Sequence, residues 1–205
     1  MRIVITAGPT REYLDPVRFL SNPSTGKMGF AIAAAAARRG HGVTLVAGPV
    51  SLKTPKGVRR IDVVSAREML AAVRKQKADV LIAAAAVADW RPEKRAVKKL
   101  KKSAMTGTLR LARNPDILKT VKGVCKVGFA AETGNPVKEA LRKCREKGLE
   151  FVVANDVTER GAGFGTDTNR VTLVFPDGRV CRLPIMTKTM VARRIIDELE
   201  ERRNT

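Results

Sequence analysis

Residues 21–29, SNPSTGKMG, contain the residue types of a loop that binds phosphate. A nucleotide loop of the P-loop type needs a glycine five residues before its Gly-Lys pair. It also needs a Ser or Thr after that pair, whose hydroxyl binds Mg²⁺. Here Ser21 stands at the first position and Met28 at the last. The stretch therefore lacks both ends of the P-loop pattern.

A dinucleotide-binding loop is the second template for this stretch. Its pattern, G-x-G-x-x-G, would fall on residues 24–29, where Ser24 replaces the first glycine. An acidic residue should follow about 20 positions later to hold the ribose hydroxyls. Residues 47–49 are Ala-Gly-Pro instead. A dinucleotide-dependent reductase thus remains an alternative, but one that the sequence disfavours.

The remaining chemistry of the loop still favours an anion. Two glycines allow close backbone approach where a helix begins, and the free N–H groups there carry about half a positive charge. Neighbouring hydroxyls and a lysine add donors. An ordinary helix start with glycines packed on a sheet is the alternative. We expect a phosphate or substrate loop that consists of Gly8, Ser24, Thr25, Gly26, Lys27 and Gly29.

The elements that position this loop alternate between strand and helix. Short β-branched or apolar runs predict strands at 2–8, 41–48, 59–64, 124–131 and 149–156, and 79–90 is expected to begin as a buried strand and run into a loop. Helical patterns predict helices at 26–39, 66–76, 114–121, 136–147 and 188–202. Residues 9–25 are expected to be irregular, 91–113 to form a basic flap, 159–169 a Gly-rich loop and 170–184 a hairpin. This order predicts an α/β fold with a doubly wound, mainly parallel, Rossmann-like sheet, and a single domain over residues 1–205.

Polar motifs follow several of the predicted strands. They are AAAVADW (84–90), NPDIL (114–118), GFAAET (128–133) and ANDV (154–157). Because the carboxyl ends of parallel strands meet at one edge of a sheet, these motifs are expected to converge where open α/β sheets bind ligands.

The charge of the chain favours anionic partners. The formal net charge is +20, from 40 Lys and Arg against 20 Asp and Glu. Only six Phe, one Tyr and one Trp are present, and they do not alternate with the basic runs as stacking platforms for bases would. Phosphorylated small molecules are therefore favoured, with a nucleic-acid-binding module as an alternative. The three widely spaced cysteines predict reduced thiols, and the absence of a long apolar run predicts a cytoplasmic protein with no membrane span.

Taken together, these motifs resemble a known enzyme family. ITAGPTREYLDPVRFLSNPSTGKMG, AAAVADW, KKLKK, NPDIL, GFAAET and ANDV, in this order, resemble phosphopantothenoylcysteine synthetase of the bacterial and archaeal type that uses CTP. The resemblance implies that 4′-phosphopantothenate is ligated to L-cysteine through an acyl-cytidylate, with release of pyrophosphate and CMP, in coenzyme A biosynthesis. It also implies Mg²⁺, a homodimer, and a flavin-dependent decarboxylase that is either fused or separate. The related ATP-using enzymes remain an alternative, although the compact KKLKK and GFAAET motifs favour CTP.

The resemblance also assigns residues. It implies catalytic roles for Asn22, which would face the acyl-cytidylate, and for Lys99, which would close over the triphosphate from the flap. It implies that Asp116 also serves as a metal ligand. The implied nucleotide-binding residues are Ala83, Ala84, Ala85, Asp89, Lys99, Pro115, Asp116, Ile117, Leu118, Phe129, Lys143 and Lys147.

Overall fold

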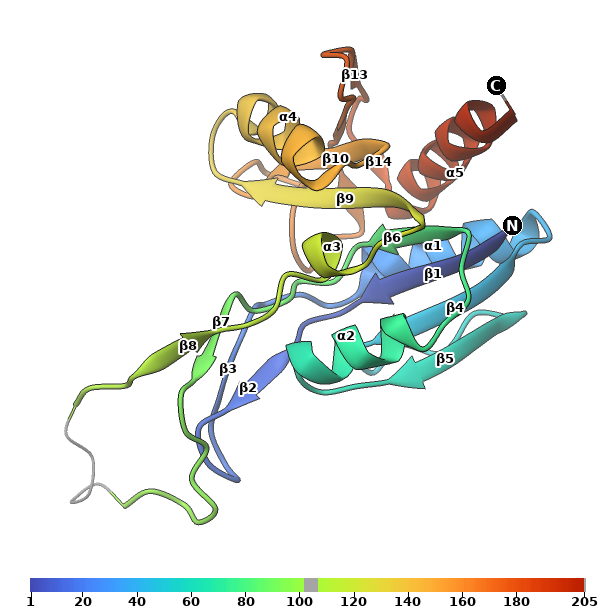
Figure 1. Ribbon diagram of the computed structural model, residues 1–205. Coiled ribbons are helices and arrows are strands. Elements are labelled where there is room, and N and C mark those ends of the chain that lie inside the picture. Colours follow the sequence, from blue (N-terminus) through green and yellow to red (C-terminus); the bar gives the residue numbers. More distant parts are fainter. Residues whose placement is uncertain (102–106, 205) are drawn as a thin grey trace.

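The computed structural model, which describes residues 1–101 and 107–204, is built on an eight-stranded sheet (Figure 1). The strand order is β13-β12-β10-β9-β6-β1-β4-β5. Six neighbouring strands are parallel, and they are β5 (Val58–Asp62), β4 (Gly42–Ala47), β1 (Arg2–Ala7), β6 (Val80–Ala83), β9 (Cys125–Glu132) and β10 (Phe151–Asp156). The antiparallel hairpin of β12 (Thr172–Val174) and β13 (Val180–Arg182) completes one edge. The predicted fold class is confirmed.

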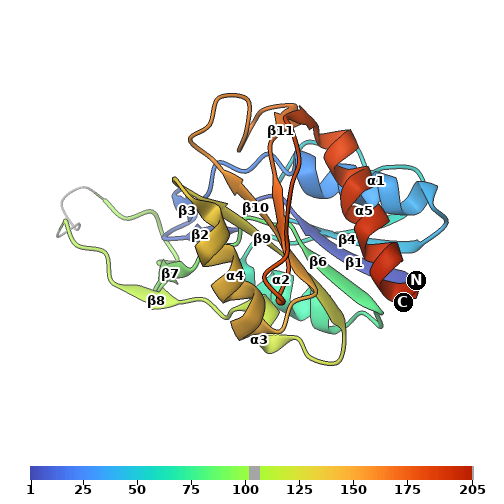
Figure 2. The same cartoon turned by 90° about the horizontal axis from the view of Figure 1, so that it is seen from above.

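Helices cover both faces of this sheet. On one face lie α1 (Lys27–Arg38) and α5 (Lys188–Asn204), which run side by side in Figure 2. On the other lie α2 (Ala66–Arg74), α3 (Ile117–Thr120) and α4 (Pro136–Lys147). Alternate residues of β1 face the two layers, because Ile3 and Ile5 pack with the α1 and α5 layer while Val4 packs with the α2 layer. Burial on both faces explains why the parallel strands read as nearly continuous apolar runs.

The strand order reverses between β1 and β6. From β1 the chain moves through α1 to β4 and β5, and then returns across the sheet to β6 and β9. The connections that leave the carboxyl ends of β1 and β6 therefore diverge and open a crevice between them, which is where open α/β sheets bind ligands.

Gly29 fixes how closely α1 approaches β1 at this crevice. A Cβ atom at Gly29 would lie 2.5 Å from Ala7 Cβ and 3.0 Å from the carbonyl oxygen of Thr6. Alanine is the better helix former by about 1 kcal/mol, but this overlap would force the helix away from the strand. We expect Gly29→Ala to lower the free energy of unfolding by about 1–3 kcal/mol, measured by urea denaturation. Gly42→Ala is the control, because its Cβ would meet only Met1 O at 4.0 Å; an equal loss in both variants would contradict the packing argument.

Three local predictions need correction. Residues 9–25 are not irregular throughout, since β2 (Arg11–Tyr13) and β3 (Phe19–Ser21) pair antiparallel around a turn in which Asp15 accepts backbone hydrogen bonds. The helix predicted at 114–121 is shorter, because Asp116 caps it by accepting from the Lys119 N–H. Within the predicted Gly-rich loop, β11 (Thr168–Asn169) pairs with β14 (Met186–Thr187). These strands have two or three residues each, too few to show a period.

The described parts of the predicted basic flap, residues 91–101 and 107–113, extend away from the sheet (Figure 1). Its base is an antiparallel pair of β7 (Trp90–Pro92) and β8 (Leu111–Arg113). The flap residue Lys102 belongs to the stretch 102–106, which lies outside the described residues.

The three cysteines are free thiols, as predicted. Cys144 is buried, and burial raises the pKa of its thiol to about 11, whereas Cys125 and Cys181 are half-buried. Among the helices of residues 1–101 and 107–204, none has the length and apolar character needed to cross a bilayer.

Candidate functional site

Two adjoining cavities occupy the crevice at the carboxyl ends of the strands. The larger has a volume of about 390 Å³ and the smaller about 120 Å³. Both are lined by Ala85, Ala86, Phe129, Ala131 and Phe164, so these residues form the boundary between them. A ligand with two or three chemical parts could span both cavities.

The smaller cavity opens on the N-terminus of α1. Gly26 is the N-cap residue with a φ of 79°, and no side chain caps the helix there. The first N–H groups of this 12-residue helix therefore face the cavity with their partial positive charge, as an anion requires. Of the six predicted loop residues, all except Gly8 line this cavity. Besides the cap residue Gly26, they are Ser24, Thr25, Lys27 and Gly29. Gly8 lies beneath the loop, where a Cβ at Gly26 would come within 3.4 Å of its Cα atom.

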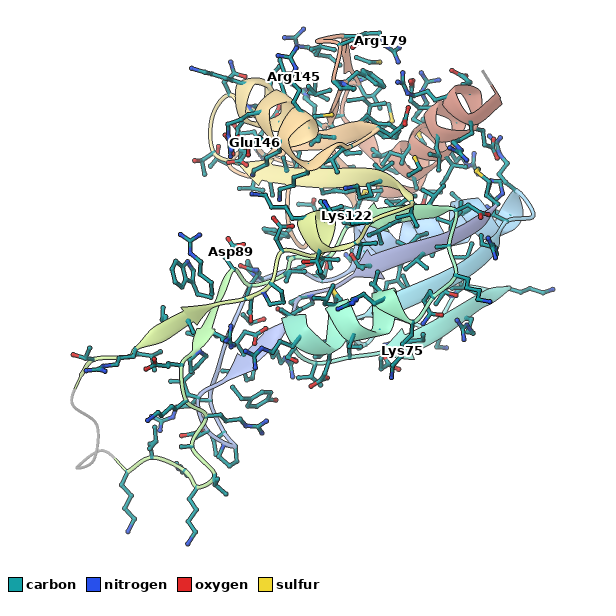
Figure 3. The ribbon with its side chains drawn as sticks, viewed as in Figure 1. Lys75, Asp89, Lys122, Arg145, Glu146 and Arg179 are labelled. Carbon is teal, nitrogen blue, oxygen red and sulfur yellow. The ribbon has the colours of Figure 1, made fainter. Side chains whose placement is uncertain are left out.

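The larger cavity collects most of the predicted nucleotide-binding residues. Its walls come from the segments after β6, around α3, at the end of β9 and along α4. The predicted residues among its lining are Asn22, Ala83, Ala85, Asp89, Pro115, Asp116, Ile117, Leu118, Phe129, Lys143 and Lys147, while Ala84 lines the smaller cavity. Figure 3 shows Asp89 where the flap leaves the body of the protein. Residues far apart in the chain thus meet at one rim.

Each of the two predicted lysines on α4 is already paired with a carboxylate. Lys147 Nζ lies 2.8 Å from Asp116 Oδ2, and Lys143 Nζ lies 2.6 Å from Glu132 Oε1. Burial raises the pKa of Asp116, but hydrogen bonds from Lys147 and the Lys119 N–H outweigh it, so the pKa lies below its ordinary value. Both cations are therefore held in place at the cavity wall before an anion arrives.

Asn22 is held at the edge of the larger cavity. It is half-buried, and its Nδ2 donates a hydrogen bond of 3.1 Å to the carbonyl oxygen of Ala86. That bond fixes the plane of the amide and leaves a carbonyl oxygen and a second N–H for a ligand. Such an amide both donates and accepts without adding charge.

Lys99 is exposed on the flap, and the described cavities do not include it in their lining. Its neighbour Leu100 is tied at both backbone groups to the turn between β2 and β3. Asp15 Oδ2 accepts from the Leu100 N–H at 3.1 Å, and Arg18 Nη2 donates to the Leu100 carbonyl at 2.9 Å. The ammonium of Lys99 therefore projects from a backbone that is anchored beside it.

This anchor depends on the ionised carboxylate of Asp15. The side chain is fully buried and accepts hydrogen bonds from the Arg18 guanidinium and three backbone N–H groups, which hold its pKa well below the ordinary range although burial opposes them. A depressed pKa in the folded state contributes stability above the unfolded pKa of about 3.9, and that contribution is lost as the pH falls.

We therefore expect the free energy of unfolding of the wild type to fall more steeply between about pH 5 and 2 than that of Asp15→Asn. Urea titrations at each pH would measure the two slopes. Asp62→Asn is the control, since the side chain of Asp62 is 71% exposed. Identical slopes for wild type and Asp15→Asn would show that the anchor does not titrate in this way.

Three buried polar residues at the smaller cavity were not predicted as site residues. They are Asn155, Asn169 and Lys188, with exposures of 7%, 4% and 7%. Lys188 Nζ donates to the carbonyls of Gly163 at 3.0 Å and Thr166 at 2.6 Å, which secures the Gly-rich loop over the cavity. Asn155 lies in the ANDV strand-end motif, which was a usable signal. The other two reach the site through β11 and the start of α5, and no local pattern indicates that.

The described residues suit a metal ion only if a bound ligand supplies most of its coordinating atoms. Among them, no group of three His, Cys, Asp or Glu side chains is placed to hold a metal. Asp116 already accepts from Lys119 and pairs with Lys147. In nucleotide sites, however, Mg²⁺ is held mainly by phosphates and water, with one or two carboxylates. The larger cavity, whose lining includes the carboxylates of Asp89 and Asp116, therefore fits a metal only if a phosphorylated ligand and water supply most of its ligands.

Comparisons with known proteins place the chain in a family. The family model described as "DNA/pantothenate metabolism flavoprotein C-terminal domain" matches residues 1–202. The chain is 48% identical over 212 residues to the coenzyme A biosynthesis bifunctional protein CoaBC of Escherichia coli K12, covering 98% of this chain and 52% of that protein. It is 49% identical over 204 residues to CoaBC of Bacillus subtilis strain 168, covering 96% of this chain and 50% of that one.

The same relationship holds in three dimensions. The crystal structure of the C-terminal domain of a CoaBC protein superposes with a TM-score of 0.83 at 44% identity, covering 99% of this chain and 95% of that domain. The chain thus spans about half the length of the curated relatives it matches, and it corresponds to their C-terminal part. The resemblance seen in the sequence motifs is confirmed at this level. The chain belongs to the family of DNA/pantothenate metabolism flavoprotein C-terminal domains.

Proposed function

We propose that this chain, acting as one domain, joins 4′-phosphopantothenate to L-cysteine with CTP as the activating nucleotide. One observation carries the proposal. A single crevice brings together a helix N-terminus without a side-chain cap, two lysines on one face of α4 and a neutral amide at Asn22. The first two features suit phosphates, and the third suits an uncharged acyl group. CoaBC relatives are named as coenzyme A biosynthesis proteins, which supports this substrate class.

The first step must activate a carboxylate, because oxide is not a usable leaving group. A carboxylate oxygen of phosphopantothenate attacks the α-phosphorus of CTP and forms an acyl-cytidylate, while the bond to the β-phosphate breaks and pyrophosphate leaves. Lys143 and Lys147 hold the nucleotide phosphates in this step. Lys99 neutralises charge that develops at the α-phosphate when the flap approaches, since fixed cations stabilise such a transition state.

The second step forms the amide. The cysteine nitrogen attacks the acyl carbon, the bond to the cytidylate oxygen breaks, and CMP leaves as the amine loses a proton. Asn22 donates to the acyl oxygen as negative charge develops there and accepts from the incoming amine. A neutral amide suits this position because a carboxylate would repel both the acyl oxygen and the phosphate.

The other assignments stay with this proposal. Mg²⁺ would enter on the triphosphate, and when bound it supplies charge neutralisation beside Asp116. A homodimer is supported by exposed apolar side chains on the β2–β3 hairpin and the flap, including Val17, Phe19, Trp90 and Leu111. The decarboxylase partner is supported by the word bifunctional in the names of relatives twice as long. The cytoplasmic location remains a prediction.

The test is to incubate the protein with phosphopantothenate, cysteine, Mg²⁺ and either CTP or ATP. We expect pyrophosphate, CMP and a new thiol-bearing amide with CTP, and much less with ATP. Equal rates with both nucleotides would favour the ATP-using alternative. Absence of pyrophosphate and amide with either nucleotide would overturn the proposal.

A further inference from the structure

Lys126 is a buried lysine that lies behind the wall of the larger cavity. It is the second residue of β9, is only 8% exposed, and does not line the cavity. Its Nζ donates to two backbone carbonyl oxygens, that of Leu118 at 3.1 Å and that of Lys147 at 2.6 Å. The first belongs to α3 and the second to the last residue of α4. One ammonium thus joins two elements that both line the cavity.

The two carbonyls need such a donor. The last four carbonyls of an α-helix lack partners within the helix, and the C-terminal end carries partial negative charge. Lys147 ends α4, so its carbonyl is one of these. Burial lowers the pKa of the Lys126 ammonium, and Lys122 nearby adds to this effect while Asp116 opposes it. The group has lost much of its water and depends on the two carbonyls instead.

The same two elements meet a second time on the cavity side. Asp116, which caps α3, pairs with the side chain of Lys147 at 2.8 Å. Leu118 of α3 also packs over Gly128 of β9, where a Cβ would lie 3.4 Å from Leu118 Cδ1. Lys126 thus fixes the backbone of Lys147 relative to α3. The position of the Lys147 ammonium in the cavity depends on this backbone position.

We propose that Lys126 is a positioning residue for nucleotide binding, which fixes α3 against the end of α4 and thereby holds Lys147 at the cavity wall. This inference rests on the proposed function for the identity of the ligand, because it assumes that Lys147 meets a nucleotide phosphate. Lys126 itself touches no substrate. It acts through the backbone of Lys147, and its removal lets the two walls of the cavity shift relative to each other.

The experiment measures the interaction of the protein with CTP in two ways. Calorimetry gives the Kd, and the pyrophosphate assay gives the KM. We expect Lys126→Met to raise both by about tenfold, as for loss of a charge-assisted hydrogen bond, while kcat changes by less than about threefold. Lys126→Gln keeps an N–H donor group but loses the charge, and should give an intermediate rise in Kd and KM. If the Met variant does not fold, the Gln variant provides the test. Lys122→Met is the control, because Lys122, which is labelled in Figure 3, is exposed and has the same charge as Lys126, whose pKa it affects.

A double-mutant cycle separates positioning from general destabilisation. If Lys126 acts through Lys147, the rise in KM for Lys126→Met combined with Lys147→Met will be smaller than the product of the two single effects. A multiplicative result would overturn the proposal, as would an unchanged Kd in folded Lys126 variants or an equal rise in Lys122→Met. If the wild type binds CTP but releases no pyrophosphate, the proposed function fails while the Kd comparison still decides on Lys126. If it binds no CTP, both fail.

Discussion

The Asn22→Asp protein is expected to release about one equivalent of pyrophosphate per site from CTP and then to stall, which is the signature of an accumulating intermediate. Amide formation should fall by at least about 100-fold, as for loss of a group that stabilises developing oxyanion charge. The phosphate-binding features remain, because the α1 N-terminus and the two α4 lysines are separate from Asn22. In the proposed mechanism, however, the new carboxylate would face an acyl oxygen and a phosphate, both of which it would repel.

Rapid-quench measurement of pyrophosphate, cytidylate and amide in one time course would follow both steps. Asn135→Asp serves as the control, because it makes the same chemical change at an exposed N-cap of α4, where Asp caps as well as Asn. Normal amide formation by Asn22→Asp would remove this residue from the mechanism.

The second large effect is expected for Lys99→Gln. We expect pyrophosphate release to slow by about 100-fold, since a fixed cation at a crowded α-phosphate is worth several kcal/mol in the transition state. The free energy of unfolding should change by less than about 0.5 kcal/mol, because the side chain is exposed on the flap. Single-turnover pyrophosphate release and urea denaturation measure the two quantities.

Two neighbouring lysines give the controls for this variant. Lys94→Gln removes an exposed charge from the same flap and should leave the rate unchanged. Lys98→Gln tests the register of the motif, since Lys98 precedes Lys99 directly. A wild-type rate in Lys99→Gln, or an equal loss in Lys94→Gln, would contradict the assigned role.

Most of the fold could be predicted from the sequence, because the clearest apolar patterns belong to the strands that are most deeply buried. The strands β1, β4, β9 and β10 are apolar on both faces, and the helices between them begin and end at recognisable caps, such as Ser65 for α2. The parallel order then follows from the alternation of strand and helix. The strand-end motifs were predicted to converge, and the larger cavity brings eleven of the predicted residues together.

The missed features are those that tertiary contacts decide. Strands of two or three residues, such as β11 and β14, carry no usable period. From the sequence, Lys188 is expected to be the first residue of an exposed helix. It is buried beside the smaller cavity only because α5 packs against α1. Lys126 likewise reads as one charged residue in an apolar strand. The placement of Lys99 away from both cavities depends on the anchoring of Leu100, which no local pattern predicts.

That anchoring links the two proposed catalytic residues mechanically. Ala96 and Leu100 of the flap are bonded to Leu14, Asp15 and Arg18 in the turn that joins β2 to β3. The strand β3 ends at Ser21, next to Asn22. If the flap moves toward the crevice, these hydrogen bonds would carry the movement to the β2–β3 hairpin and so to Asn22. In the proposed mechanism, acid activation and amine attack would then depend on the same movement.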